Sequence, residues 1–222
     1  MKVTLWKRIV RPLLPEGERW EFHRDLCYRA PVGRILFGLL AEGSAFDKGN
    51  YIWCVRTPLF VPSEGGIGLS YSYRVGGGSN KIPAEHVEEL NAAIVHCLNE
   101  NFDEEAALAR LTVDGADTLN TRVTEVAAYA HILLGDLAAA GRLLARAAAA
   151  DIDRTSWWQV AIVERVLAVQ QLLAEHGQDA VIAHLDRQAK ASAGSFAFFL
   201  ESSVNQSQYI GLKELARGSK KM

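Results

Sequence analysis

Residues that could do chemistry are scattered along this chain, and few stand at the spacings that catalysis or metal binding requires. The clearest pair is His86 and Glu89, three residues apart on one face of a predicted helix, a spacing used by metal sites in helical bundles. Such a site needs a matching pair on a facing helix, and the sequence offers none. None of the six histidines forms an HxH or HExxH pattern either. We interpret the pair as a solvated helix start and predict no metal site and no cofactor.

Two glycine-rich stretches have the composition of phosphate-binding loops but not their order. Residues 76–81, GGGSNK, lie between a predicted strand and a predicted helix, which is where such a loop would lie. A P-loop needs glycine before its lysine and serine or threonine after it, whereas Lys81 follows Asn80 and precedes Ile82. We interpret this stretch as a connector. Residues 65–68, GGIG, open a strand rather than a helix and are typical of a turn.

The potential nucleophiles lack activating neighbours. Ser44 and Ser63 lie in no nucleophile elbow, and Cys54 lies in an apolar run with nothing nearby in sequence to lower its pKa. We therefore predict no catalytic residue and a protein that is not an enzyme. The alternative is an enzyme whose site lies between sheet and helices, and its acid–base candidates are His23, Glu42 and Asp47.

Composition predicts a folded, soluble protein. Of the 222 residues, 49% are hydrophobic and 23% are charged, enough apolar material for a core and too much for a disordered chain. No run of 18 apolar residues occurs, so we predict no contact with a membrane. The three cysteines lie far apart, as thiols of a reducing compartment do. Because the first 15 residues lack the apolar segment of a secretory signal, we expect a cytoplasmic protein.

Charge is divided unevenly along the chain. Residues 1–81 carry 12 Lys and Arg against 7 Asp and Glu, whereas residues 82–222 carry 12 against 19. The basic residues of the first part stand singly along predicted strands, and no groove-reading helix accompanies them. We therefore predict that nucleic acid is not a partner.

The composition and the spacing of apolar residues change at residues 76–81. Before this tract, hydrophobic periodicity predicts a helix over 3–12 and strands over 18–29, 34–41, 51–60 and 67–75. Pro58 favours an edge or bulge position for the third strand. Four strands with short connections imply an antiparallel sheet with the helix packed on one side.

After the tract, Ala, Leu and Glu recur at helical spacing. We predict helices over 83–99, 103–111, 119–134, 137–150, 155–175, 179–192 and 206–216. From 127 to 150, 11 of 24 residues are alanine, which lets two helices approach closely in an antiparallel hairpin. The predicted fold is α+β: a helix and a four-stranded antiparallel sheet (1–81), then an all-helical array of hairpins (82–222), as two domains or one continuous one.

Residues 120–192 resemble tetratricopeptide-repeat hairpins. Gly135-Asp136 matches the family's turn. Ala140 and Ala147 match its small positions at the helix crossing, and Leu144 matches its bulky position. The usual aromatic after the turn and the proline that ends the unit are replaced by Leu137 and Ile152. A second turn, at 177–180, follows 42 residues after the first, more than the family's period of about 34. The resemblance therefore implies helix-hairpin packing rather than a regular superhelix.

The first eighty residues resemble an uncharacterised bacterial domain in the order of their elements: an opening helix, a strand of aromatic and arginine residues, then a meander of strands. Members of that group occur among immunity-type proteins that bind and block a toxin. The resemblance implies the same kind of activity for this chain.

Four aromatic residues are the candidates for contact with a partner. Trp157 and Trp158 open a predicted helix and point about 100° apart, so both rarely fit one core. The pattern favours their burial against the preceding hairpin; the alternative is that one lies at a surface, where tryptophan often anchors a partner. Tyr71 and Tyr73, with Tyr51, are expected on one aromatic face of the sheet. We predict a non-enzymatic bacterial protein-interaction module of the immunity type. Besides the enzyme, the alternative is a homodimeric scaffold or ligand sensor, and the sequence leaves the oligomeric state open.

Overall fold

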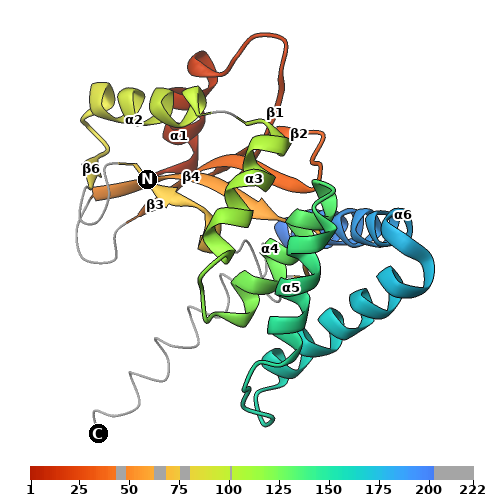
Figure 1. The fold of residues 1–222 in the computed structure, drawn as a ribbon. Coiled ribbons are helices and arrows are strands. Elements are labelled where there is room, and N and C mark those ends of the chain that lie inside the picture. Colours follow the sequence, from red (N-terminus) through yellow and green to blue (C-terminus); the bar gives the residue numbers. More distant parts are fainter. Residues whose placement is uncertain (44–48, 63–68, 76–80, 101, 203–222) are drawn as a thin grey trace, which may run out of the picture.

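The computed structural model describes residues 1–43, 49–62, 69–75, 81–100 and 102–202, with side chains as far as residue 194. The helices of this part are α1 Val3–Val10, α2 Val87–Asn99, α3 Glu104–Gly115, α4 Thr121–Leu133, α5 Leu137–Ala148 and α6 Trp157–Ser202. Figure 1 shows α1 and α2 above a sheet, with α3 crossing in front and α4 to α6 forming a lobe beside it. The predicted α+β class is confirmed.

The sheet is antiparallel throughout the described residues, in the order β1-β2-β3-β4-β5, with β6 also paired to β4. Its strands are β1 Arg19–His23, β2 Leu26–Ala30, β3 Ile35–Gly43, β4 Gly49–Pro58, β5 Tyr73–Arg74 and β6 Ile82–Pro83. The prediction of four strands is thus wrong in number. Pro58 marks neither an edge nor a bulge, because β4 has three partner strands and Pro58 simply ends it, opposite Ile35 in an unbroken register.

The first predicted strand, over 18–29, is in fact a hairpin. Phe22 pairs with Cys27, and the chain reverses through Arg24, which adopts a positive φ of 50°. Two-residue turns of this kind usually carry Asn or Gly, whereas this one carries Arg24 and Asp25. The hydrophobic alternation therefore ran through the turn without a visible break.

The last predicted strand, over 67–75, is wrong for most of its length. Leu69–Tyr71 form a 3₁₀ helix (η2), only Tyr73–Arg74 pair with β4, and residues 67 and 68 lie outside the described part. Ser72 gives the physical reason. Its hydroxyl accepts a hydrogen bond from the Arg56 amide at 3.0 Å and donates one to the Arg56 carbonyl at 3.4 Å, so a side chain takes the place of the backbone ladder.

One face of the sheet is covered by helices. Phe37, Leu39 and Cys54 share this face through the β3–β4 register, and all are buried. The Cys54 sulfur lies 4.0 Å from the Cys97 carbonyl oxygen of α2, and on α1 Trp6 is fully buried. The predicted helix over 3–12 is confirmed as α1 and a 3₁₀ turn, η1, at Arg11–Leu13.

The helices after the sheet follow the prediction closely, with three shifts, one of which is that the helix expected to end at 192 continues to Ser202. The helix expected from residue 83 begins at Val87, because Pro83 belongs to β6, and the helix expected to end at 111 continues to Gly115 as α3. The other two are present as α4 and α5. Gly115 marks a close approach of α3 to α4: a Cβ there would lie 2.0 Å from the Cβ of Ala127.

The helix α6 is two helices joined at Gly177, as the sequence predicted. Gly177 has a φ of 78° and a ψ of −176°, which are not helical values, so the helix is kinked at this residue. The first half packs against α4 and α5, and the second half returns toward the sheet (Figure 1). The helix predicted over 206–216 lies outside the described residues.

Buried apolar side chains form one continuous cluster in the described residues, from Trp6 on α1 to Ala189 on α6. The division of the chain at residue 81 stays a prediction. None of the described helices combines the length and the apolar character that crossing a membrane would require.

Candidate functional site

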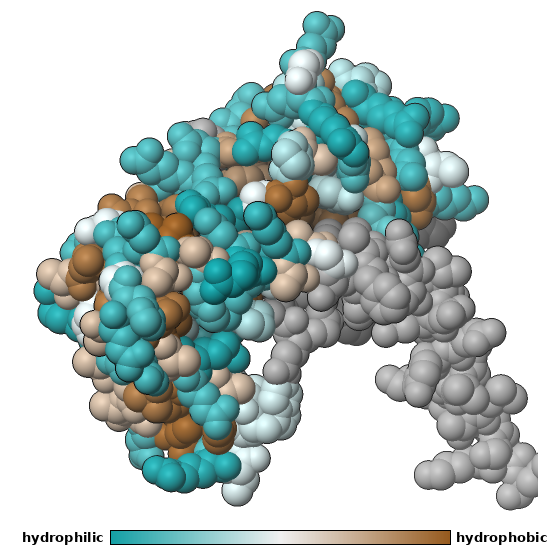
Figure 2. Space-filling view, turned by 90° about the vertical axis from the view of Figure 1, so that its right-hand side faces the viewer, coloured by the Kyte–Doolittle hydropathy of each residue, from teal (hydrophilic) through white to brown (hydrophobic). Residues whose placement is uncertain are grey.

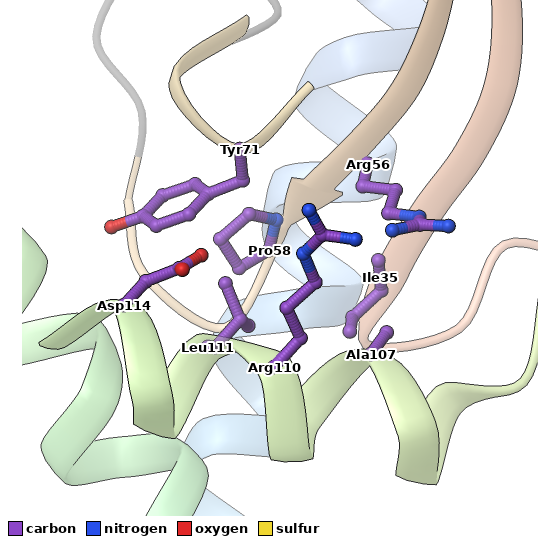
Figure 3. A pocket seen from close by; sticks show the side chains of 8 residues that line it. All are labelled: Ile35, Arg56, Pro58, Tyr71, Ala107, Arg110, Leu111 and Asp114. Carbon is purple, nitrogen blue, oxygen red and sulfur yellow. The ribbon is translucent and has the colours of Figure 1, made fainter. Parts of the chain in front are cut away.

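A small pocket opens where the end of the sheet meets α3 (Figure 3). Its enclosed space is about 10 Å³, room for one water-sized group. The apolar lining consists of Ile35, Pro58, Ala107 and Leu111, and the polar lining of Arg56, Tyr71, Arg110 and Asp114. The four residues from α3 lie three and four positions apart, so a single helix face supplies half of the site.

Arg56 is the most deeply placed polar group of this pocket. It lies on the helix-covered face of β4, and the whole residue is 8% exposed. Its Nη2 atom donates a hydrogen bond to Oε2 of Glu100 at 2.8 Å, at the end of α2. Burial raises the pKa of the Glu100 carboxyl, but the hydrogen bond and the positive charge of Arg56 outweigh it, so that this pKa is lowered. The pair ties β4 to α2.

Arg56 keeps one buried donor unused. Within the described residues its Nε atom makes no hydrogen bond. Figure 3 shows the guanidinium group of Arg110 reaching up from α3 toward that of Arg56. No ion pair of Arg110 occurs in the described part of the chain. Two cations therefore share this end of the pocket.

The other end of the pocket holds Tyr71 and Asp114 (Figure 3). The Tyr71 hydroxyl is buried and has no hydrogen-bond partner in the described residues. Burial raises the pKa of Tyr71 far above its ordinary value, so the hydroxyl stays protonated at any physiological pH. Asp114 is exposed at the rim.

The structure does not bring the three tyrosines to one aromatic face. Tyr71 lies on η2, while Tyr73 pairs with Cys54 on the helix-covered face, with its ring edge-on to His96 at a centroid distance of 6.4 Å. Tyr51 lies three residues from Cys54 and so faces the opposite side. Both Tyr71 and Tyr73 are half-buried.

On the opposite face Tyr51 belongs to a different cluster. The guanidinium carbon of Arg74 lies 4.1 Å from the Tyr51 ring centroid and 4.5 Å from that of Trp53. Glu42 joins them: its Oε2 accepts from the Trp53 indole at 2.8 Å and from Arg74 at 3.1 Å.

The acid–base candidates of the enzyme alternative are not assembled into a site. Glu42 accepts hydrogen bonds from Trp53 and Arg74. His23 lies on β1 and makes no hydrogen bond to Glu42 among the described residues. Burial, and then the neighbouring Arg24, lower the pKa of His23. Asp47 lies outside the described residues. Neither His23 nor Glu42 lines the pocket at α3.

The remaining chemical candidates are dispersed. His86 Nδ1 lies 2.9 Å from Glu89 Oε1 on an exposed helix start. Cys27, Cys54 and Cys97 are buried free thiols, and burial raises the pKa of Cys27 to about 12. In the described part of the chain no three His, Cys, Asp or Glu residues gather where they could hold a metal ion.

Trp157 and Trp158 both lie at the surface, at the first turn of α6. Their exposed fractions are 60% and 48%. The buried stripe of this half of the helix is made by Ile162, Val166 and Val169, and the two indoles project outside it. The sequence pattern favoured burial of the tryptophans over one exposed tryptophan, and the structure corrects both predictions, because both indoles are exposed.

The chain matches no family model, no curated protein and no solved structure. The resemblances to tetratricopeptide hairpins and to immunity-type domains therefore stay predictions.

Sequence reasoning missed Arg56 and Arg110 as site residues. A signal for Arg56 was present: it stands two residues after Cys54, in phase with the apolar residues of its strand, so its side chain had to enter the core face. Arg110 carried no such signal, because it lies on a helix with ordinary polar neighbours.

Proposed function

We propose that this protein is a non-enzymatic protein-interaction module that binds its partner with the outer face of the first half of α6. The observation that carries the proposal is the exposure of two adjacent tryptophans, 60% for Trp157 and 48% for Trp158. Tryptophan is large and apolar, so leaving two side by side in water is unfavourable, and it is among the residues enriched at binding hot spots.

Further apolar side chains of α6 are exposed or half-buried near the tryptophans, with the exposed Glu164 among them. Leu167 is 50% exposed, Ala168 is exposed, and Val160 and Val163 are half-buried. Figure 2 shows apolar residues, in brown and tan, lying among polar ones on the helical lobe at the lower left.

Charge defines the chemistry of the partner. Exposed acidic residues surround the tryptophans: Asp151 and Asp153 precede the helix and Glu164 lies two turns along it, with Arg154 as the one exposed cation between them. The part of the chain from residue 82 onward has seven more acidic than basic residues. A protein segment with an apolar row and a basic rim complements this surface.

The test is affinity capture from native lysate with matched variants. Wild type is expected to retain a stoichiometric partner that the double variant Trp157→Ser/Trp158→Ser loses. Val113→Ser removes an apolar side chain that is 73% exposed on α3, and it should retain the partner as wild type does. Thermal unfolding of wild type and of both variants checks that all three proteins are folded. Absence of a stoichiometric partner, or equal capture by the tryptophan variant, would contradict the proposal.

A toxin neutralised by binding is the specific partner class that the immunity-type resemblance favours. The captured protein decides this. A toxin arrests growth when expressed alone, and co-expression with this chain restores growth. The double tryptophan variant is expected to lose that rescue. If the captured protein does not arrest growth, the toxin hypothesis is wrong and only the general proposal of a protein-interaction module stands.

A further inference from the structure

The pocket at α3 contains a buried hydrogen-bond donor that no group in the described residues uses. Arg56 is more than nine-tenths buried, and its Nε atom is left without a hydrogen bond within the described residues. Buried donors without an acceptor are uncommon in folded proteins. Because Arg56 also lines the pocket, we take its unused donor as a sign that an acceptor can bind there.

A second cation adjoins this donor. Figure 3 shows the Arg110 guanidinium facing that of Arg56 across the space between β4 and α3. Glu100 is the carboxylate that pairs with Arg56, through Nη2 and from the α2 side. Asp114 lies on the far side of Arg110, toward Tyr71 (Figure 3). Two guanidinium groups with one bonded carboxylate leave room for a second.

We propose that Arg56 and Arg110 bind a single carboxylate group, from a small organic acid or from an acidic side chain of a protein. The fork of N–H donors on a guanidinium group matches the two oxygens of a carboxylate. With Arg110 in its present position the pocket has room for only one water-sized group, about 10 Å³; the exposed Arg110 side chain moves outward to admit the larger carboxylate. Ile35, Pro58 and Leu111 offer an apolar wall to the carbon chain behind the carboxylate.

This site is independent of the proposed function. It lies on β4 and α3, whereas the tryptophans lie on α6. Substitution of Arg110 should therefore leave partner capture intact, and substitution of the tryptophans should leave carboxylate binding intact. Failure of one proposal does not entail failure of the other.

The experiment is a titration of the ¹⁵N-labelled full chain, followed through the arginine Nε–H signals in NMR spectra at constant ionic strength. Propionate is expected to shift the Arg56 signal saturably, and neutral propionamide to leave it in place. Arg110→Gln should weaken propionate binding by about tenfold, as expected for the loss of a hydrogen bond to a charged group. The control Arg154→Gln removes an exposed arginine of the loop before α6 and should bind like wild type.

A blocked tripeptide with a central glutamate separates the two sources of the carboxylate. Saturable binding of propionate alone assigns the site to small acids, binding of the peptide alone assigns it to acidic side chains, and binding of both supports a site open to either. No saturable shift with either probe would overturn the proposal. So would an equal response to propionamide, an equal response to phosphate, or unchanged binding by Arg110→Gln.

Discussion

Glu125 is a fully buried carboxylate on α4, and its replacement by glutamine should destabilise the protein severely. Arg165 of α6 donates to Oε1 from Nε at 2.8 Å and to Oε2 from Nη2 at 3.1 Å. Arg122 donates to Oε2 at 3.1 Å and to the Pro62 carbonyl at 2.6 Å. One side chain thus holds α4, α6 and the segment after β4 together.

The expected magnitude follows from the burial of each member. The Glu125 side chain is 0% exposed, Arg165 21% and Arg122 30%. Breaking a buried ion pair costs about 3–5 kcal/mol, and the partial exposure of both arginines points to the lower end. Glu125→Gln also turns an amide N–H₂ group toward a guanidinium. We expect a loss of about 3 kcal/mol in the free energy of unfolding, or roughly 6–12 °C in the melting temperature.

Urea unfolding followed by far-ultraviolet circular dichroism measures this loss. The control is Glu164→Gln, an exposed carboxylate on α6, which should change the free energy of unfolding by less than about 0.5 kcal/mol. Replacing all three charges by methionine should recover most of the stability, because the penalty comes from unpaired charge rather than lost volume. A loss below about 1 kcal/mol in Glu125→Gln would refute the reasoning.

Three further predictions concern packing, pH and an unused hydroxyl. Gly115→Ala places a Cβ 2.0 Å from that of Ala127 and should cost about 1–3 kcal/mol; the added substitution Ala127→Gly should restore part of it, measured by urea unfolding. The hydrogen bond from Arg34 lowers the pKa of Asp186 despite its partial burial, so this pair stabilises the fold above the unfolded pKa of about 3.9. The stability difference between wild type and Asp186→Asn should be present at pH 7 and disappear as pH falls through the lowered pKa; a difference that persists at pH 2 would contradict this. Tyr71→Phe removes a buried hydroxyl without a partner in the described residues, so thermal unfolding should show equal or higher stability, and a loss above about 1 kcal/mol would reveal a missed hydrogen bond.

The pattern of apolar residues was sufficient to predict an element wherever the residues that it marked are buried together. The run from Ile35 to Ala41 is apolar on both faces, and it lies within β3 in the middle of the sheet. The break of α6 at Gly177 was visible for the same local reason, because a positive φ favours glycine. Such features depend on residues close together in the sequence.

Features that depend on distant partners were not predictable in this way. The alternation over residues 69–75 is real, yet the Ser72 hydroxyl bonds to the backbone of Arg56 and ends the ladder early. The cations of the α3 pocket come from residues 54 positions apart along the chain. No local pattern states that two such side chains meet, because their approach is set by how α3 crosses the sheet.

The reversal at Gly177 has a mechanical consequence. Beyond it, Asp186 reaches Arg34 at the start of β3, 152 residues away in sequence and 2.6 Å away in space. The sheet and the helical lobe are thereby joined at several places: by the chain through α2 and α3, by the Arg122–Pro62 hydrogen bond and by this ion pair. A force applied at the tryptophan end of α6 is transmitted to the strands through two helices that meet at Gly177, and we expect the sheet and the helical lobe to resist rotation against each other.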